Sequence, residues 1–517
     1  MRAWDLTLPL DAERDQPLFL QLANGIAEHI RAGRLKPGDA LPGTRELAAR
    51  VGLNRNTVVS GYAELAAEGL VGTRVGGGTF VLDANPAATG VGQLSETPSY
   101  ELAPAPAPLP ARRVAPSGAL LLSASTPDVR HFPARELARA FRRALSQRGR
   151  NLPGYADPCG HVRLRIPLAA MLARSRGIAA APDNLMITRS IEQAIDLVAR
   201  TLIAPGDVVA VENFGYAPAW NVLRLAGARL VPIALDRDGL DLDALESLLQ
   251  QQRIRAVFLT PHHQYPTGAV MSPRRRARLA DLALQHRFAI LEDDYDHEFH
   301  YAGKPILPLA AGAARANAVY IGSLANLLAP GVGAGFVVAP PAVFERIYRL
   351  RAASDARSDA AMEIAIAELF EDGELLRHTR RMRRVYAARR DLLAAALRRQ
   401  LGSALAFELP DGGTGLWARV DPAIDALAWE TAGEREGVIL QNSRAFHFTQ
   451  RDAGFFRLGF SYLDEAELVE AVRRMARALT RVRTSQLAAV RAPPAETPAE
   501  ATASPPRRRN AMAGSTR

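Results

Sequence analysis

Lysine is almost absent from this chain of 517 residues. Of its 64 basic residues 62 are arginine, and only Lys36 and Lys304 are lysine. Cysteine is equally scarce: Cys159 stands alone, which excludes a disulfide within the chain and favours a reducing compartment. No apolar run of about 18 residues occurs, and the first residues lack the apolar core of a signal peptide. We therefore expect a cytoplasmic protein with no membrane partner.

The remaining composition is that of a folded protein with several parts. Hydrophobic residues make up 48% of the chain, which excludes disorder throughout. A single core rarely grows beyond about 250–300 residues, so the length predicts more than one domain. We expect a small mixed domain at 1–83, a Pro/Ala-rich linker at 84–118, a large α/β domain at 119–485 and a disordered basic tail at 486–517. The net charge of +10 permits binding to nucleic acids or other anions.

In the large segment, apolar β-rich runs alternate with helical stretches. This alternation predicts parallel pairing in a doubly wound α/β sheet. The runs lie at 208–213, 228–235, 254–261, 288–295, 318–324 and 335–340. Ligands of such sheets bind beyond the carboxyl ends of the strands. Asp293, Asp294, Ser323 and Asn326 lie at or just beyond these ends, so we expect them to line a crevice.

The N-terminal segment has the pattern of a helix-turn-helix. A helical pattern at 18–32 is followed by two more at 44–52 and 53–70, joined by a tight turn through Gly52. The second helix of such a pair can enter the major groove of DNA, and Asn54 is its expected N-cap. Two short β-rich runs around a glycine triplet follow, which predicts a β-wing.

The first turn of that second helix carries the residues suited to base recognition. Asn54, Arg55, Asn56 and Thr57 are expected to be exposed there, and Arg and Asn make bidentate contacts with base edges. Residues 1–83 hold nine basic and ten acidic residues, so the segment is not basic overall. Binding is therefore expected to depend on localised arginines and on dimer avidity.

Residues 15–82 resemble the GntR-type winged helix-turn-helix through LPGTRELA, VGLNRNTVVSGYAELAAEGLV and GGTFV. The resemblance implies DNA binding, with Arg45, Arg55 and Thr57 contacting phosphates and base edges. It also implies that the wing glycines Gly76 and Gly78 let the backbone approach DNA. A winged helix that only mediates protein contacts is the alternative. Gly61 departs from the pattern and costs about 1 kcal/mol of helix propensity relative to alanine.

Residues 150–480 resemble fold-type-I pyridoxal-phosphate aminotransferases, in the arrangement of MocR-like regulators that fuse such a domain to a GntR head. The similar stretches include LPGYADPCGHVRLR, TPHHQYPTGAVMSPRRR, LEDDYDHEFHY and FRLGFSYL. The resemblance implies that Asp293 meets the pyridinium nitrogen, Tyr295 the ring oxygen and Tyr216 the ring itself. Arg457 would be the fork for a substrate carboxylate. The family's cofactor positions further include Ser190 and Ser323.

The lysine that this chemistry requires is missing. The family pattern GSfSKtLaPglRlGy aligns without a gap to GSLANLLAPGVGAGF, which places Asn326 at the lysine and Gly333 at a phosphate-binding arginine. In TRSIEQAI, Ser190 stands for a glycine and Glu192 for a glutamine. An amide cannot form an imine, and a carboxylate beside a phosphate is unfavourable. Lys304 is expected to face solvent, so covalent pyridoxal phosphate is not expected.

The sequence thus predicts a DNA-binding transcriptional regulator with no catalytic residue. Its aminotransferase-like domain is expected to form a homodimer, head-to-tail by resemblance, and to sense an amino-acid-like or carboxylate effector through Arg457. A pyridoxal-phosphate-dependent enzyme is the alternative. The substitutions fit either drift in a dispensable pocket or a pocket adapted to another ligand. We interpret His262 and His263 as loop structure and expect no metal.

Overall fold

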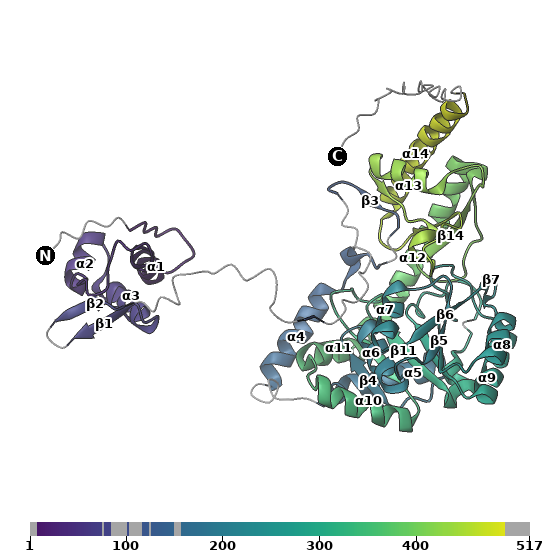
Figure 1. The fold of residues 1–517 in the computed structure, drawn as a ribbon, viewed down its shortest axis with the longest axis horizontal. Coiled ribbons are helices and arrows are strands. Elements are labelled where there is room, and N and C mark those ends of the chain that lie inside the picture. The colour runs from purple at the N-terminus through teal and green to yellow at the C-terminus, as the bar shows by residue number, and fades with distance from the viewer. Residues whose placement is uncertain are drawn as a thin grey trace, which may run out of the picture. The chain divides into compact units, whose positions relative to one another are not determined.

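The computed structural model describes residues 8–74, 77–83, 101–102, 116–123, 126–148, 157–304 and 306–491 (Figure 1). Gly76 lies outside the described residues, as do most of the expected linker and the chain beyond residue 491. The chain divides into two compact units, Met1–Ala105 and Pro106–Arg517, and each is considered by itself. None of the helices in the described part of the chain has the length and apolarity that a membrane span requires.

The first unit contains three helices and a two-stranded antiparallel hairpin. These elements are α1 (Leu18–Arg31), α2 (Thr44–Val51), α3 (Arg55–Ala67), β1 (Val71–Arg74) and β2 (Gly78–Val81). Leu22 of α1, Leu47 of α2 and Leu65 of α3 are fully buried in one apolar cluster. The helix α2 ends at the predicted turn, because Gly52 takes a left-handed conformation (φ 69°) after it; α3 ends at Ala67, three residues before the predicted end. The unit is therefore a winged helix-turn-helix.

The packing of α1 against α3 explains Gly61. A Cβ at Gly61 would lie 3.0 Å from Leu22 Cδ2 and 3.1 Å from the carbonyl oxygen of Phe19. The absence of a side chain lets the two helices approach closely, which offsets the low helix propensity of glycine.

The second unit contains a seven-stranded sheet in the order β4-β12-β11-β10-β9-β5-β6. Its strands are β4 (Leu185–Thr188), β5 (Val208–Glu212), β6 (Arg229–Ile233), β9 (Ala256–Leu259), β10 (Ala289–Asp294), β11 (Ala318–Ser323) and β12 (Gly335–Val338). The strands from β6 to β11 in this order pair in parallel. The expectation of parallel pairing is wrong for β12, which runs antiparallel to both β11 and β4. A parallel crossover needs about a dozen residues or more, usually with a helix, and no helix joins β11 to β12.

Helices cover both faces of this sheet. They are α5 (Val162–Arg176), α6 (Ile191–Leu202), α7 (Ala217–Leu225), α8 (Leu242–Gln251), α9 (Pro273–His286) and α10 (Pro341–Ser354). Successive residues of a strand point to opposite faces. Val209 accordingly lies in one apolar cluster with Trp220 of α7, and Ala210 lies in another with Leu279 of α9. Burial of both faces is typical of parallel sheets in α/β proteins.

A smaller part follows the sheet. It contains α11 (Ala360–Glu371), α12 (Glu374–Leu401), β13 (Leu405–Ala406), β14 (Gly415–Val420), α13 (Ala426–Arg435), β15 (Val438–Ile439), β16 (Phe455–Gly459) and α14 (Glu465–Arg491). The order β13-β14-β16 forms a three-stranded antiparallel sheet, and β15 pairs with β3 (Leu120–Leu121). The unit also includes α4 (Ala134–Arg148) and the short hairpin of β7 (Leu235–Asp236) and β8 (Gly239–Leu240). The last helix, α14, continues to Arg491, past the expected start of the tail at residue 486. No proline interrupts the sequence between Glu465 and Pro493.

Candidate functional site

The first turn of α3 presents polar side chains to solvent. Asn54 is the N-cap, and its side chain accepts a hydrogen bond from the backbone N–H of Asn56 at 2.9 Å. Asn54, Arg55 and Asn56 are exposed, and Thr57 is half-buried. The Nε of Arg55 donates to Thr44 Oγ1 at 3.4 Å, which links the two helices of the motif. The predicted N-cap is therefore confirmed, and the predicted base-reading residues lie together.

Two other predicted DNA-binding residues of this unit, Arg45 and Gly78, are also exposed to solvent. Arg45 is exposed on the first turn of α2. Within the described ranges neither Arg45 nor Arg55 forms an ion pair, whereas Arg50 pairs with Glu46 at 2.6 Å. Gly78 at the start of β2 is exposed and has a positive φ of 87°, a conformation that favours glycine.

In the second unit, the predicted crevice residues lie at the ends of two neighbouring strands: Asp293 and Asp294 end β10, and Ser323 and Asn326 end and follow β11. Asp293 is the penultimate residue of that strand and is 3% exposed. Its Oδ1 has no hydrogen-bond partner among the residues that the structure describes. Burial, followed by the charges of Asp294 and Asp296, raises the pKa of Asp293 well above its usual value. The carboxyl group is thus poised to meet a cationic or hydrogen-bonding ligand group.

Asn326 is held in place at the end of β11. Its side-chain Nδ2 donates to the backbone carbonyl of Tyr295 at 3.1 Å. Ser323 Oγ accepts from the backbone N–H of Ala325 at 3.0 Å, which shapes the same turn. Asn326 therefore connects the loops that follow β10 and β11.

A carboxylate occupies the start of α6. Ser190 caps this helix by accepting from the backbone N–H of Gln193. Glu192 lies in the first turn, and its Oε1 accepts from the hydroxyl of Tyr216 at 2.7 Å. Burial raises the pKa of Glu192, but hydrogen bonds from Ser190, Tyr216 and the backbone outweigh it, so the net pKa is below its usual value. An ionised carboxylate at a helix N-terminus is favoured by the helix dipole, and it takes the place of an external anion.

Gly333 allows the loop after β11 to contact the loop before α6. A Cβ at this position would lie 2.2 Å from the carbonyl oxygen of Arg189. No side chain of any kind fits there without a shift of the backbone. The position cannot hold an arginine in this conformation.

Arg457 of β16 packs against Tyr265, which belongs to a group of aromatic side chains. It is 2% exposed, and its Nη1 donates to the carbonyl of Pro266 at 2.6 Å. Its guanidinium lies 4.7 Å from the ring centroid of Tyr265. Tyr265 in turn contacts Tyr216 and Tyr295 edge-on, at centroid distances of 5.7 and 5.8 Å. Sequence reasoning missed Tyr265. Its position directly before PTG, within a stretch that resembles the aminotransferase family, could have indicated it.

The sequence matches two protein families. It matches "Bacterial regulatory proteins, gntR family" over residues 18–81 and "Aminotransferase class I and II" over residues 118–475. It is 32% identical to the probable rhizopine catabolism regulatory protein MocR of Rhizobium meliloti, over 90% of this chain and 95% of that protein. It is 29% identical to the HTH-type transcriptional regulator TauR of Rhodobacter capsulatus, over 89% and 96% of the two chains. The chain belongs to the MocR-like family of GntR transcriptional regulators.

A solved structure shows the same fold for the second unit. LysN, an α-aminoadipate aminotransferase from Thermus thermophilus, has a TM-score of 0.66 and 27% identity, covering 71% of this chain and 94% of that chain. The expected architecture, a GntR winged helix followed by a fold-type-I aminotransferase domain, is confirmed. Membership of the GntR family implies DNA binding, and the aminotransferase family implies association with pyridoxal phosphate.

Three departures from the family pattern have defined contacts in this regulator. By resemblance Asn326 stands at the lysine position and Gly333 at an arginine position; Asn326 is hydrogen-bonded to Tyr295, a Cβ at Gly333 would collide with Arg189, and Glu192 accepts a hydrogen bond from Tyr216. Lys304 is exposed, as expected, and Lys36 in the first unit is exposed as well. Asp293, Tyr295 and Tyr216 remain at positions that could contact a ring without a covalent bond.

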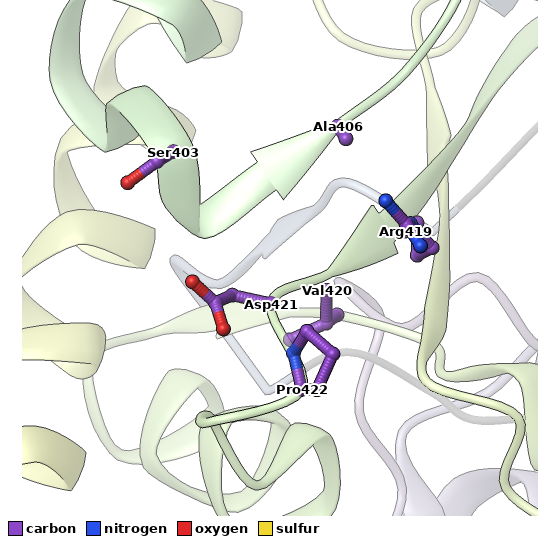
Figure 2. A pocket seen from close by; sticks show the side chains of 6 residues that line it. All are labelled: Ser403, Ala406, Arg419, Val420, Asp421 and Pro422. Carbon is purple, nitrogen blue, oxygen red and sulfur yellow. The ribbon is translucent and has the colours of Figure 1, made fainter.

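A separate cavity lies near the C-terminal antiparallel sheet (Figure 2). Its volume is about 150 Å³, and it is lined by Ser403, Ala406, Arg419, Val420, Asp421 and Pro422. Ligand sites commonly enclose roughly 300–1,000 Å³. Figure 2 shows the side chains of Ser403 and Asp421 on one side of the cavity and that of Arg419 on the other. The cavity is smaller than this range, and none of its lining residues is among the predicted crevice residues.

His262 and His263 are buried in the loop after β9. The structure places His297 and His300, which sequence reasoning did not single out, beside them. A carboxylate is also close: Asp296 Oδ1 lies 2.8 Å from His263 Nδ1. Asp296 lies 33 residues from His263 in the chain, so nothing in the sequence indicated this contact.

Proposed function

We propose that this regulator recognises DNA through the first turn of α3 and senses a carboxylate effector in a crevice that lacks covalent pyridoxal phosphate. The observation that carries the proposal is the Asn326 amide, which stands at the lysine position and is hydrogen-bonded to Tyr295. The aminotransferase-like domain then acts as a sensing and dimerising domain rather than as an enzyme. Its expected location is the cytoplasm.

The DNA contacts follow from side-chain chemistry. Arg55 and the amides of Asn54 and Asn56 can read base edges in the major groove, and Thr57 and Arg45 can contact base edges or phosphates. The Gly78 turn brings the wing backbone to the duplex. Since the domain as a whole is not basic, these few groups and the avidity of two heads supply the affinity.

The effector site is supported by Arg457 and the aromatic side chains around it. A guanidinium recognises carboxylates through two parallel hydrogen bonds, and stacking on Tyr265 fixes its plane. By resemblance to the family, Asp293 faces the ring nitrogen of a bound ligand. Its carboxyl group can form a hydrogen bond with an amino or ring nitrogen. A ligand with a carboxylate and a nitrogen, such as an amino acid, satisfies both.

The quaternary arrangement is a homodimer, head-to-tail by analogy with the family. Two DNA-binding heads then act on two half-sites. An effector changes DNA binding only if it has different affinities for two arrangements of the dimer. Effector affinity and operator affinity should therefore change each other by the same factor.

The first experiment tests DNA binding. Full-length protein is incubated with the DNA upstream of its own gene and footprinted over a range of salt concentrations. A protected sequence that is lost in Arg55→Ala supports the proposal. Absence of sequence-specific protection at every salt concentration contradicts it.

The second experiment tests the cofactor. Wild-type protein is mixed with pyridoxal phosphate, reduced with borohydride and mapped by peptide mass spectrometry. No stoichiometric adduct is expected at Lys36 or Lys304, while Asn326→Lys should acquire one at residue 326. A stoichiometric adduct on wild-type protein would restore the enzyme hypothesis, and transaminase activity would then be assayed.

The third experiment tests the effector. A panel of amino acids and dicarboxylates is screened by thermal shift. Arg457→Ala should abolish any shift that the wild-type protein shows, whereas Arg419→Ala, an exposed position on the neighbouring strand β14, should keep it. A shift that survives in Arg457→Ala would place the ligand elsewhere.

A further inference from the structure

Four of the ten histidines in the chain gather beyond the ends of two neighbouring strands. His262 and His263 follow β9, and His297 and His300 follow β10. The His262 ring lies 4.3 Å from that of His263 and is stacked on that of His297 at 4.4 Å. One ring nitrogen from each of His262, His263 and His300 can be chosen so that all three lie within 4.8 Å of one another. No sequence-local turn explains this gathering, because 34 residues separate His263 from His297 in the chain.

Most of the ring nitrogens in this group have no hydrogen-bond partner in the described part of the chain. His262 is 2% exposed, and neither of its nitrogens forms a hydrogen bond with any described residue. The same holds for both nitrogens of His300 and for the Nε2 atoms of His263 and His297. Buried polar atoms are nearly always hydrogen-bonded in proteins, and leaving one unpaired is unfavourable. Several in one place indicate a ligand that satisfies them together.

The two remaining nitrogens are held by carboxylates. His263 Nδ1 lies 2.8 Å from Asp296 Oδ1, and His297 Nδ1 lies 2.8 Å from Asp294 Oδ2. Histidines that bind metals usually donate their second ring N–H to a carboxylate, which fixes the ring and directs the other nitrogen at the ion. In His263 this arrangement leaves Nε2 as the free donor atom.

The group is separate from the effector crevice. Asp293 and Asp294 are consecutive residues of β10, so their side chains point to opposite faces of the sheet. Asp294 contacts His297 and the hydroxyl of Tyr320, whereas Asp293 belongs to the crevice. The histidines therefore lie on the Asp294 side.

We propose that His262, His263 and His300 bind a divalent transition-metal ion of the zinc type, with Asp296 as the positioning residue for His263. Three imidazole nitrogens are a known ligand set for zinc, at about 2.0–2.1 Å each, and leave a fourth position for water or a ligand. Neutral imidazole also suits cobalt, nickel and copper ions. Nitrogens at 2.0–2.1 Å from one tetrahedral ion lie roughly 3.3–3.4 Å apart, so the three nitrogens, now within 4.8 Å of one another, would move closer together on binding it.

Such an ion would stabilise the loop that carries the effector site. His263 is two residues before Tyr265 and three before Pro266, and both of these contact Arg457. A metal that joins His263 to His300 ties this loop to the segment after β10. Metal binding would thus affect the loop that contacts Arg457, in addition to any effect of the effector. The metal site does not depend on the proposed effector.

The test uses untagged full-length protein. After treatment with a chelator and dialysis, the protein is titrated with Zn²⁺ by calorimetry, and with Co²⁺ to record the visible absorption of a tetrahedral nitrogen site. One equivalent of tight metal is expected for wild-type protein. Binding should be lost in His262→Gln and in His300→Gln, and Asp296→Asn should weaken it about 10–100-fold. His286→Gln, at a half-buried position at the end of α9, is the matched control and should bind like wild type.

The two histidine variants differ in their risk of misfolding. His300 is only half-buried, so His300→Gln keeps the test valid if His262→Gln does not fold. No stoichiometric binding to the wild-type protein overturns the proposal. Stoichiometric binding that persists in both His262→Gln and His300→Gln, or that is lost equally in His286→Gln, also overturns it. Failure here leaves the DNA and effector experiments unaffected.

Discussion

Gly333→Ala tests whether the backbone of Arg189 packs closely against position 333, where the family pattern has a phosphate-binding arginine. The added Cβ would lie 2.2 Å from the carbonyl oxygen of Arg189, which is backbone and cannot rotate away. Reaching an ordinary contact distance requires a movement of roughly 1 Å in one of the two loops. Overpacking of this kind costs about 1–3 kcal/mol in the free energy of unfolding. The same reasoning predicts that Gly333→Arg destabilises the domain at least as much and does not improve pyridoxal-phosphate binding.

The measurement is urea unfolding followed by tryptophan fluorescence, since Trp220, Trp417 and Trp429 all lie in the second unit. Gly331→Ala is the matched control. It lies two residues away in the same loop, a Cβ there meets nothing within 4 Å, and its φ is not positive. The control should change the free energy of unfolding by less than about 0.5 kcal/mol. Equal midpoints for Gly333→Ala, Gly331→Ala and wild type would refute the close packing.

Three further predictions concern the head, the crevice and the core. Arg55→Ala should weaken operator binding by about 1–3 kcal/mol in fluorescence anisotropy at fixed salt, while Arg34→Ala, outside the motif, should not. Glu192→Gln removes the charge at the start of α6 and should raise the affinity for free phosphate or pyridoxal phosphate in calorimetry; unchanged affinity would place the anion site elsewhere. Arg389→Ala should lower the free energy of unfolding by about 1–3 kcal/mol, because it removes the buried partner of Asp128 at 3.0 Å while Arg130 still contacts that carboxylate at 2.7 Å. Burial raises the pKa of Asp128, but bonds from Arg130 and Arg389 lower it overall. The stabilisation is therefore present above a pH of about 4 and lost as the pH falls further, and a pH-independent urea midpoint would contradict this.

The sequence predicted most of the fold because burial on both faces leaves long apolar runs. All six predicted runs contain strands of the central sheet, and the helix boundaries of the winged helix are correct within a few residues. The strand β4 was missed because its apolar run, 185–187, is only three residues long, which is too short to distinguish from the start of a helix. The antiparallel direction of β12 was not predictable from an apolar run, since hydrophobicity carries no information on strand direction.

The site was predictable only where one motif carries the chemistry. Alignment with the family pattern is enough to identify the substitutions at Asn326, Glu192 and Gly333. Their contacts do not: the Glu192–Tyr216 hydrogen bond joins residues 24 apart, and Asp296 meets His263 across 33 residues. These residues come into contact because the strands and loops that carry them become neighbours in the folded sheet. The histidine group was accordingly invisible in the sequence, where each member has a local explanation.

The contacts of the substituted residues bear on how the crevice changed. Drift in a dispensable pocket removes interactions one at a time and leaves buried polar atoms without partners. Here the Asn326 amide is bonded to Tyr295, the Glu192 carboxylate is bonded to Tyr216, and the space at Gly333 is filled by the backbone of Arg189. These three departures from the family pattern are each matched by a compensating contact, which favours a pocket adapted to another ligand. Asp293 keeps a buried oxygen that no described residue meets, so the ligand's polar contact is expected at Asp293.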